Sequence, residues 1–182
     1  MDNAAYLLDV IRGFRNYKAL GDEAMAQVPS DPDFDRMLDA DSNSITVIVQ
    51  HIAGNFHSRY RDFLTTDGEK PERDRDGEFE TRQPATRDGV LRTWNDGWAV
   101  VMSALAALTP ADLDRTITIR GEAFLVLEAL NRSVTHTAYH VGQIVYLARH
   151  FASPNWKSLS IPKGQSNEFF AKGNYKAQGT VR

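Results

Sequence analysis

The sequence predicts an all-α protein, a four-helix bundle with a long crossover between its second and third helices. Four segments carry apolar residues at three- and four-residue spacing, as amphipathic helices do. A long polar stretch separates the second segment from the third, and strand-like alternation is confined to a few residues before the last helix. A chain of 182 residues suits one domain, and we expect residues 1–182 to form it. An irregular helical domain of the same content is the alternative.

The first two helices are expected over about residues 4–27 and 44–66. The first ends before Pro29, and the residues that follow, 30–33, are typical of a turn. Ser42 or Ser44 can cap the second helix, because a serine side chain accepts a hydrogen bond from a free N–H of the first turn. The second helix stops near Asp67-Gly68, and it carries a single apolar stripe made of Ile45, Ile48, Ile52, Phe56, Tyr60 and Phe63.

Residues 67–85 are expected to form a surface linker. Almost every residue up to 83 is charged or polar, so no face of this stretch is expected to lie in a core. The linker is long enough to cross the length of a bundle.

The third and fourth helices are expected over about residues 86–108 and 126–151. Thr109-Pro110 ends the third, since the residue before a proline disfavours helical geometry. Between them, residues 116–119 alternate polar and apolar, which predicts a short strand closed by a turn at Gly121. The fourth helix is apolar on most sides and is therefore expected to be the most buried.

Residues 153–182 are expected to form a C-terminal arm. Prolines and glycines interrupt it, which argues against another long helix. Its many large apolar residues predict that the arm packs on its own bundle or on a partner subunit: Trp156, Leu159, Ile161, Phe169, Phe170 and Tyr175.

Composition excludes several classes of function. The net charge is −3 and no basic stripe is present, which argues against nucleic-acid binding. The chain has no cysteine, so disulfides, thiolate metal sites and a cysteine nucleophile are excluded. No apolar run approaches the ~18 residues of a membrane span, and the N-terminus does not have the pattern of a signal peptide. We therefore expect a cytoplasmic protein that does not bind a membrane.

His136 and His140 form the most informative pair of polar residues. Residues four apart on a helix lie on one face, one turn apart, so both rings can bind one ion through bonds of about 2.1 Å. The pair lies in the middle of an apolar helix, where a polar ring needs a partner. Such pairs also occur as simple hydrogen-bonding or surface histidines. The residues between them do not form the HExxH motif of zinc proteases, so the general-base glutamate of that motif is absent.

His51 is the candidate for a third ligand. It lies in the middle of the second helix, and the small residues Gly54 and Asn55 leave room beside it. His57 would lie about 240° further around the same helix, and His150 about 15 Å along the axis from His140, so neither suits the same ion. His57 is expected at the rim or surface, and His150 is expected to act as a favourable charge at a helix C-terminus.

Two stretches resemble the DinB/YfiT-like metalloenzymes: residues 50–55, which contain His51, and residues 136–144, which contain His136, His140 and Gln143. Residues 160–166 resemble the C-terminal segment of one branch of that family. The resemblance spans nearly the whole chain and implies a single DinB-like domain. It also implies a four-helix bundle with a long crossover, often a homodimer, with Ni or Zn held by His51, His136 and His140.

The resemblance also implies a range of activities. Some members are transferases or isomerases that use a low-molecular-weight thiol, and others have no known activity. Three neutral imidazoles leave open positions on a divalent ion, which can activate water or an exogenous thiol against a small electrophilic substrate. We expect a metal-dependent transferase or hydrolase. The alternative is a non-catalytic metal-binding bundle that acts in dimerisation or partner binding.

Other residues near the candidate ligands have less certain roles. Asn55 and Gln143 lie one turn from ligands and can hydrogen-bond to them, or can simply join two helices. Tyr139 and Arg59 can line the mouth of the site or lie at ordinary surface positions, and no residue stands out as a general base. Because a ligating imidazole must be neutral, metal affinity is expected to fall as the pH drops through about 6.5.

Overall fold

The computed structural model describes residues 2–81 and 83–171, and the protein is mostly helical (62%). The helical class predicted from the sequence is confirmed. The described residues form six α-helices, two short 3₁₀-helices and a two-stranded sheet: α1 Asn3–Met25, α2 Pro32–Asp35, α3 Ile45–Tyr60, η1 Gly77–Phe79, α4 Arg87–Ala107, η2 Pro110–Asp114, β1 Thr116–Ile119, β2 Glu122–Leu125, α5 Val126–Ala152 and α6 Ser166–Ala171. No described helix is long and apolar enough to cross a membrane.

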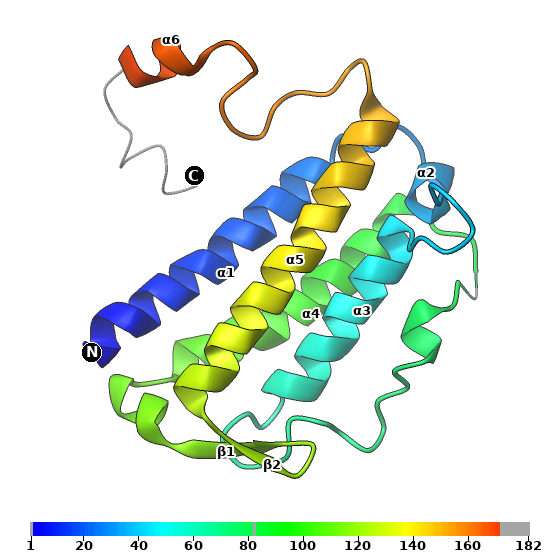
Figure 1. Ribbon diagram of the computed structural model, residues 1–182. Helices are drawn as coiled ribbons and strands as arrows, with labels where there is room; N and C mark the ends of the chain where they lie inside the picture. Colours follow the sequence, from blue (N-terminus) through cyan, green and yellow to red (C-terminus); the bar gives the residue numbers. More distant parts are fainter. Residues whose placement is uncertain (1, 82, 172–182) are drawn as a thin grey trace.

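The four long helices lie side by side, with α1 and α5 running in one direction and α3 and α4 in the opposite one (Figure 1). Since α3 and α4 are parallel, the chain must return along the whole bundle between them. The segment from residue 61 to residue 86 does this along the outer side of α3 (Figure 1). The long crossover expected between these helices is therefore present.

Capping residues set the starts of the helices. Ser44 accepts a hydrogen bond from the backbone N–H of Val47 and begins α3, as one of the two expected caps. α3 ends at Tyr60, earlier than expected, because Asp62 adopts a left-handed backbone with φ 51°. Phe63 still packs into the core after this break. The apolar stripe of the sequence therefore extends past the end of α3, and it predicted a helix longer than the one observed.

The hairpin before α5 contains the expected strand and a second one. β1 pairs antiparallel with β2, joined by Arg120 and Gly121, whose φ angles are 56° and 75°. Positive φ at both loop residues is the geometry of a tight two-residue hairpin, and glycine allows it readily. β2 was not expected because Glu122–Leu125 does not alternate polar and apolar residues. The short helix α2 was expected only as a turn.

The core is an aromatic cluster in which α3 is the most enclosed helix. Phe14, Phe56 and Trp98 come from three different helices and pack edge to face, with ring centroids 5.1–6.2 Å apart. The expectation that the fourth predicted helix, which is α5, would be the most buried is wrong. α5 leaves Tyr139 and Tyr146 62% and 65% exposed. The linker covers the side of α3 that α5 leaves open (Figure 1).

The C-terminal arm packs on the bundle only in its first part. Trp156 and Leu159 contact the core, and the backbone of Lys157 exchanges two hydrogen bonds with the side chain of Gln27. α6 has no buried residue, and Phe170 is 57% exposed. Tyr175 lies outside the described residues.

Candidate metal centre

The three predicted histidines meet inside the bundle. His51 comes from α3, and His136 and His140 lie one turn apart on α5. Nε2 of His136 lies 3.2 Å from Nε2 of His51 and 3.1 Å from Nε2 of His140. All three candidate ligand atoms fall within 4.8 Å of one another, and His51 and His140 are buried. The sequence placed these rings on two helices, and the fold turns them toward one point.

The spacing of these nitrogens suits a divalent ion. With metal–nitrogen bonds of about 2.1 Å, two ligand nitrogens lie about 3.4 Å apart at a tetrahedral angle and about 3.0 Å apart at a right angle. The separations of His136 Nε2 from the other two nitrogens, 3.1 and 3.2 Å, fall between these values, and the third pair lies within 4.8 Å. Three neutral imidazoles without thiolate or carboxylate ligands suit Ni or Zn better than Mg or Ca.

Hydrogen bonds on the far side of two rings fix their orientation. Nδ1 of His51 lies 2.9 Å from a carboxylate oxygen of Glu78, and Nδ1 of His140 lies 2.8 Å from the side-chain oxygen of Gln143. Because both partners accept, each neutral ring carries its proton on Nδ1 and keeps a lone pair on Nε2. Those lone pairs face the point where the three rings meet. This arrangement is typical of histidines that bind a metal.

Glu78 was not predicted, since it lies in the linker that was expected to stay outside the core. The carboxylate is 9% exposed and accepts two hydrogen bonds from Arg73, Nε at 2.7 Å and Nη2 at 2.9 Å. Lys70, in the same linker, is also buried. The expectation that no face of residues 67–83 would be buried is therefore wrong. A charged residue can be buried here because its partner is buried with it.

Gly54 makes room for Glu78 against α3. A Cβ built at this position would lie 2.2 Å from Oε1 of Glu78, far inside van der Waals contact. Only glycine lets the carboxylate approach the helix backbone at this point. The glycine one turn after His51 therefore has a specific role in the site.

Burial and neighbouring charges shift the pKa values of the site. Burial opposes ionisation of Glu78, but hydrogen bonds from His51 and Arg73 outweigh it, and the pKa of Glu78 is lowered. Burial, with His140 and His51 nearby, lowers the pKa of His136 to about 3. Burial also lowers the pKa of His140. His136 and His140 therefore stay neutral, as a metal ligand must be, at lower pH than an ordinary imidazole.

The remaining predicted residues divide into those that touch the site and those that do not. Gln143 bonds to His140 as described, and it also contacts the Tyr139 hydroxyl at 3.2 Å. Asn55 is half-buried beside the histidines, and none of the described hydrogen bonds joins it to them. Arg59 donates to the backbone oxygen of Gly68 and pairs with Glu69.

The two histidines outside the predicted set lie away from the cluster. His57 and His150 are exposed, as expected, and His150 lies in the last turn of α5. A positive charge there would be favourable because the end of a helix carries partial negative charge. Neither ring takes part in the three-histidine cluster of the described chain.

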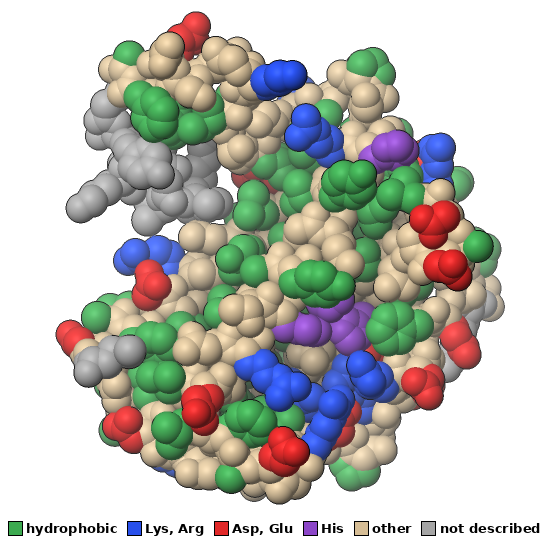
Figure 2. All heavy atoms as spheres, in the orientation of Figure 1, with side chains coloured by type: hydrophobic (Ala, Val, Ile, Leu, Met, Phe, Trp, Pro, Cys, Tyr) green, Lys and Arg blue, Asp and Glu red, His purple; other side chains and the backbone are tan. Residues whose placement is uncertain are grey.

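A cavity of about 190 Å³ opens beside His51 and His136. It lies between α3, α5, the linker and the hairpin. Its walls combine apolar side chains such as Phe63 and Ile119 with arginines from all four of these parts. In Figure 2 a small patch of histidine side chains is visible directly beside a group of Lys and Arg side chains. The candidate metal centre is therefore open on one side to a space that can hold a small molecule.

A helical bundle with three inward-facing histidines and an adjoining cavity defines a candidate metal-binding protein. The chain belongs to the family described as Protein of unknown function (DUF1572), which it matches over residues 2–165. This family lies in the DinB/YfiT-like fold superfamily. Comparisons with curated proteins and with solved structures gave no significant match.

Proposed function

We propose that the protein is a divalent-metal-dependent enzyme with a DinB-like bundle, in which His51, His136 and His140 hold Ni or Zn. The observation that carries the proposal is the open side of the three-histidine cluster, which faces the cavity of about 190 Å³. A structural metal is usually enclosed by four protein ligands, whereas a catalytic one keeps a position free.

The protein's own residues prepare the centre for a reaction. Glu78 and Gln143 hold the rings of His51 and His140 with their Nε2 lone pairs inward. The lowered pKa of His136 keeps this ring neutral over the physiological range. When bound, the ion would lower the pKa of a water molecule or of an exogenous thiol and so supply a nucleophile near neutral pH.

The reaction class that fits best is transfer or hydrolysis at a small electrophile. The chain has no cysteine, so any thiol must come from a second substrate. A low-molecular-weight thiol cosubstrate and a homodimer are part of the proposal, and their support is the resemblance to the DinB/YfiT-like enzymes. The alternative, a non-catalytic metal-binding bundle, has no need of the cavity beside His51 and His136.

A turnover screen with defined metal loading tests the proposal. Metal-free protein is loaded with Ni or Zn and incubated with a panel of thiols and electrophiles, and with electrophiles in water alone. We expect product from loaded wild type, and none from chelated protein or from His136→Ala. The matched control is His57→Ala, which removes an exposed histidine from α3 and keeps activity. Metal-loaded wild type that transforms no member of the panel, with folding intact, would favour the non-catalytic alternative.

A further inference from the structure

The cavity beside the candidate metal centre is lined by five arginines and by no acidic side chain of the described residues. They come from separate parts of the fold: Arg59 from α3, Arg73 and Arg75 from the linker, Arg120 from the hairpin and Arg132 from α5. Only Arg59 was considered for the mouth of the site from the sequence, because a single arginine otherwise looks like an ordinary surface residue. The fold gathers them around one small space next to His51 and His136, and Figure 2 shows a group of Lys and Arg side chains beside histidine side chains.

Three of the five arginines are used by the protein itself. Glu69 pairs with Arg59 at 3.1 Å and with Arg120 at 2.8 Å, and Glu78 takes both strong hydrogen bonds of Arg73. These pairs build the wall and hold the linker against α3. Two carboxylates facing three guanidinium groups leave this part of the wall positive.

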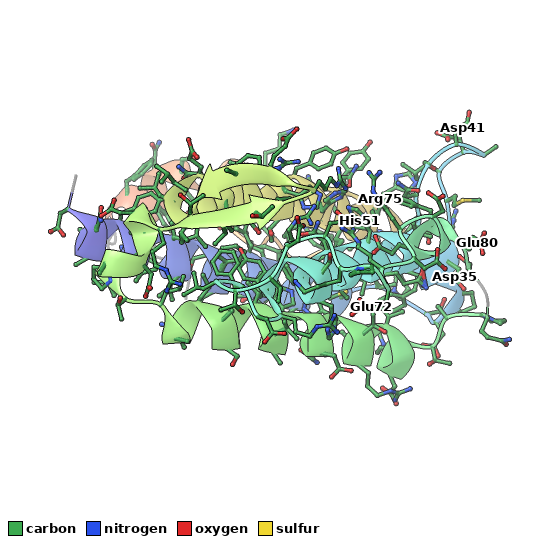
Figure 3. The ribbon with its side chains drawn as sticks, turned by 90° about the horizontal axis from the view of Figure 1, so that it is seen from below. Asp35, Asp41, His51, Glu72, Arg75 and Glu80 are labelled. Atoms are coloured by element: carbon green, nitrogen blue, oxygen red, sulfur yellow. The ribbon has the colours of Figure 1, made fainter. Side chains whose placement is uncertain are left out.

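The other two arginines have no carboxylate partner among the described ion pairs. Arg75 is exposed and lies beside His51 in Figure 3, where both are labelled, and both line the cavity. Arg132 lies one helical turn before His136 on α5, and its guanidinium sits over the ring of Phe124 at 5.7 Å. Stacking on an aromatic ring orients a guanidinium while leaving its N–H groups free for another partner.

Two buried hydroxyl groups also lack a partner of good geometry. Tyr60 and Ser133 line the cavity, and their hydroxyl groups lie close enough to interact with each other, but neither oxygen makes a hydrogen bond of good geometry within the described part of the chain. A buried polar group without a partner costs free energy, and a ligand that supplies one removes that cost.

We propose that the cavity binds the anionic end of a small substrate, a carboxylate or a phosphate, through Arg75 and Arg132. The inference rests on the proposed function and specifies the substrate class of the same site. A guanidinium recognises either anion through two parallel hydrogen bonds. The apolar wall of Phe63 and Ile119 suits a short apolar body, and the volume of about 190 Å³ holds about six water molecules. The reacting atom then lies toward the three histidines.

Binding of small probes tests the assignment independently of turnover. Benzoate, phenyl phosphate and neutral benzamide are titrated by calorimetry into metal-free and metal-loaded protein at one low ionic strength. We expect benzoate or phenyl phosphate to bind at least about tenfold more tightly than benzamide, since the neutral amide offers no charge to an arginine. The stronger of the two anions identifies the headgroup that the cavity prefers.

Substitutions locate the binding site. Arg75→Gln and Arg132→Gln are each expected to weaken anion binding about tenfold, as the loss of a charged hydrogen-bond pair does. Arg149→Gln, at the far end of α5, changes the net charge equally and is the matched control. The arginine variants should keep the metal affinity of wild type, because neither residue contacts a histidine nitrogen among the described hydrogen bonds.

The outcomes separate the two proposals. Anion binding that depends on Arg75 and Arg132 in a protein that binds no metal would reject the metal-dependent enzyme and keep the anion site. Two results in a protein that binds metal normally would overturn the anion site alone. One is benzamide binding as tightly as the anions, and the other is an Arg149→Gln change that weakens anion binding as much as Arg132→Gln does. No binding of either anion up to about 10 mM would overturn it as well.

Discussion

Glu78 accepts a hydrogen bond from His51 across 2.9 Å between Oε2 and Nδ1, although 27 residues separate the two in the chain. The long crossover brings the carboxylate back to the helix that the chain has just left. The bond fixes the tautomer of His51 and directs its free Nε2 toward His136. The linker is therefore part of the candidate metal centre as well as a connection between α3 and α4.

Replacing Glu78 should weaken metal binding more than replacing another linker carboxylate. Glu78→Gln keeps an acceptor for His51 but loses the negative charge, and Glu78→Ala loses both. We expect metal affinity to fall about tenfold for Gln and up to about 100-fold for Ala, the usual range for such partners. Competition with a chelator of known affinity measures it. Glu72→Gln, an exposed linker residue paired with Arg61, is the control and should bind as wild type does.

Gly54→Ala should damage the centre although alanine is the better helix former. In an open helix this change stabilises by about 0.5–1 kcal/mol. Here the new Cβ would lie 2.2 Å from Oε1 of Glu78 and must displace the carboxylate. We expect lower metal affinity and no gain in stability, measured by chelator competition and urea unfolding. Gly142→Ala on α5, where a Cβ meets nothing within 4 Å, should stabilise and leave affinity unchanged.

The metal-free protein should lose stability as the pH falls from 6.5 toward about 3. The pKa of His136 is lowered to about 3 in the folded protein, while the unfolded chain titrates at 6.5. Below pH 6.5 the unfolded state therefore binds a proton that the folded state does not, which favours unfolding. His140, whose pKa is also lowered, acts in the same direction.

Urea unfolding midpoints between pH 4.5 and 7.5 check this sign. His136→Gln should lose less stability over that range than wild type, since it removes one proton-binding group from the unfolded state. His57→Gln removes an exposed ring outside the cluster and serves as the control. Parallel pH profiles for wild type and His136→Gln would contradict the prediction.

Removal of the metal should leave the bundle folded. The aromatic core of Phe14, Phe56 and Trp98 is built without any ligand residue, so a chelator should remove only the binding contribution to stability. We expect a lower Tm with helical circular dichroism and cooperative unfolding retained. Loss of helical signal on chelation would instead assign the metal a structural role.

Much of the fold followed from local patterns, because each long helix carries its own apolar spacing and its own stop or cap. The break after Tyr60 did not, since Phe63 continues the apolar spacing past Asp62, where the backbone turns. β2 was missed because its pairing with β1, rather than its own pattern, makes it a strand.

The three histidines could be predicted from the sequence, whereas most of the residues around them could not. His136 and His140 show their shared face through helical spacing alone. His51 followed from its place in the middle of the second helix beside small residues, and the resemblance implied the same residue. Glu78 reads as one more charge in a polar linker, and its burial depends on Gly54 and Arg73 together. The sequence feature that could have pointed to Glu78 was Gly54, which lies one turn after the candidate ligand His51. The arginines converge only through the tertiary arrangement of separate elements.

The metal content of the protein tests the central claim most directly. Protein purified without a nickel column is analysed for metals, then stripped, titrated with Ni and Zn, and compared with His51→Ala, His140→Ala and the control His57→Ala. The account predicts about one ion per chain for wild type and the control, with both ligand variants strongly impaired. Less than about 0.2 ion per chain, with no uptake on titration, or ligand variants that bind as wild type does, would contradict it.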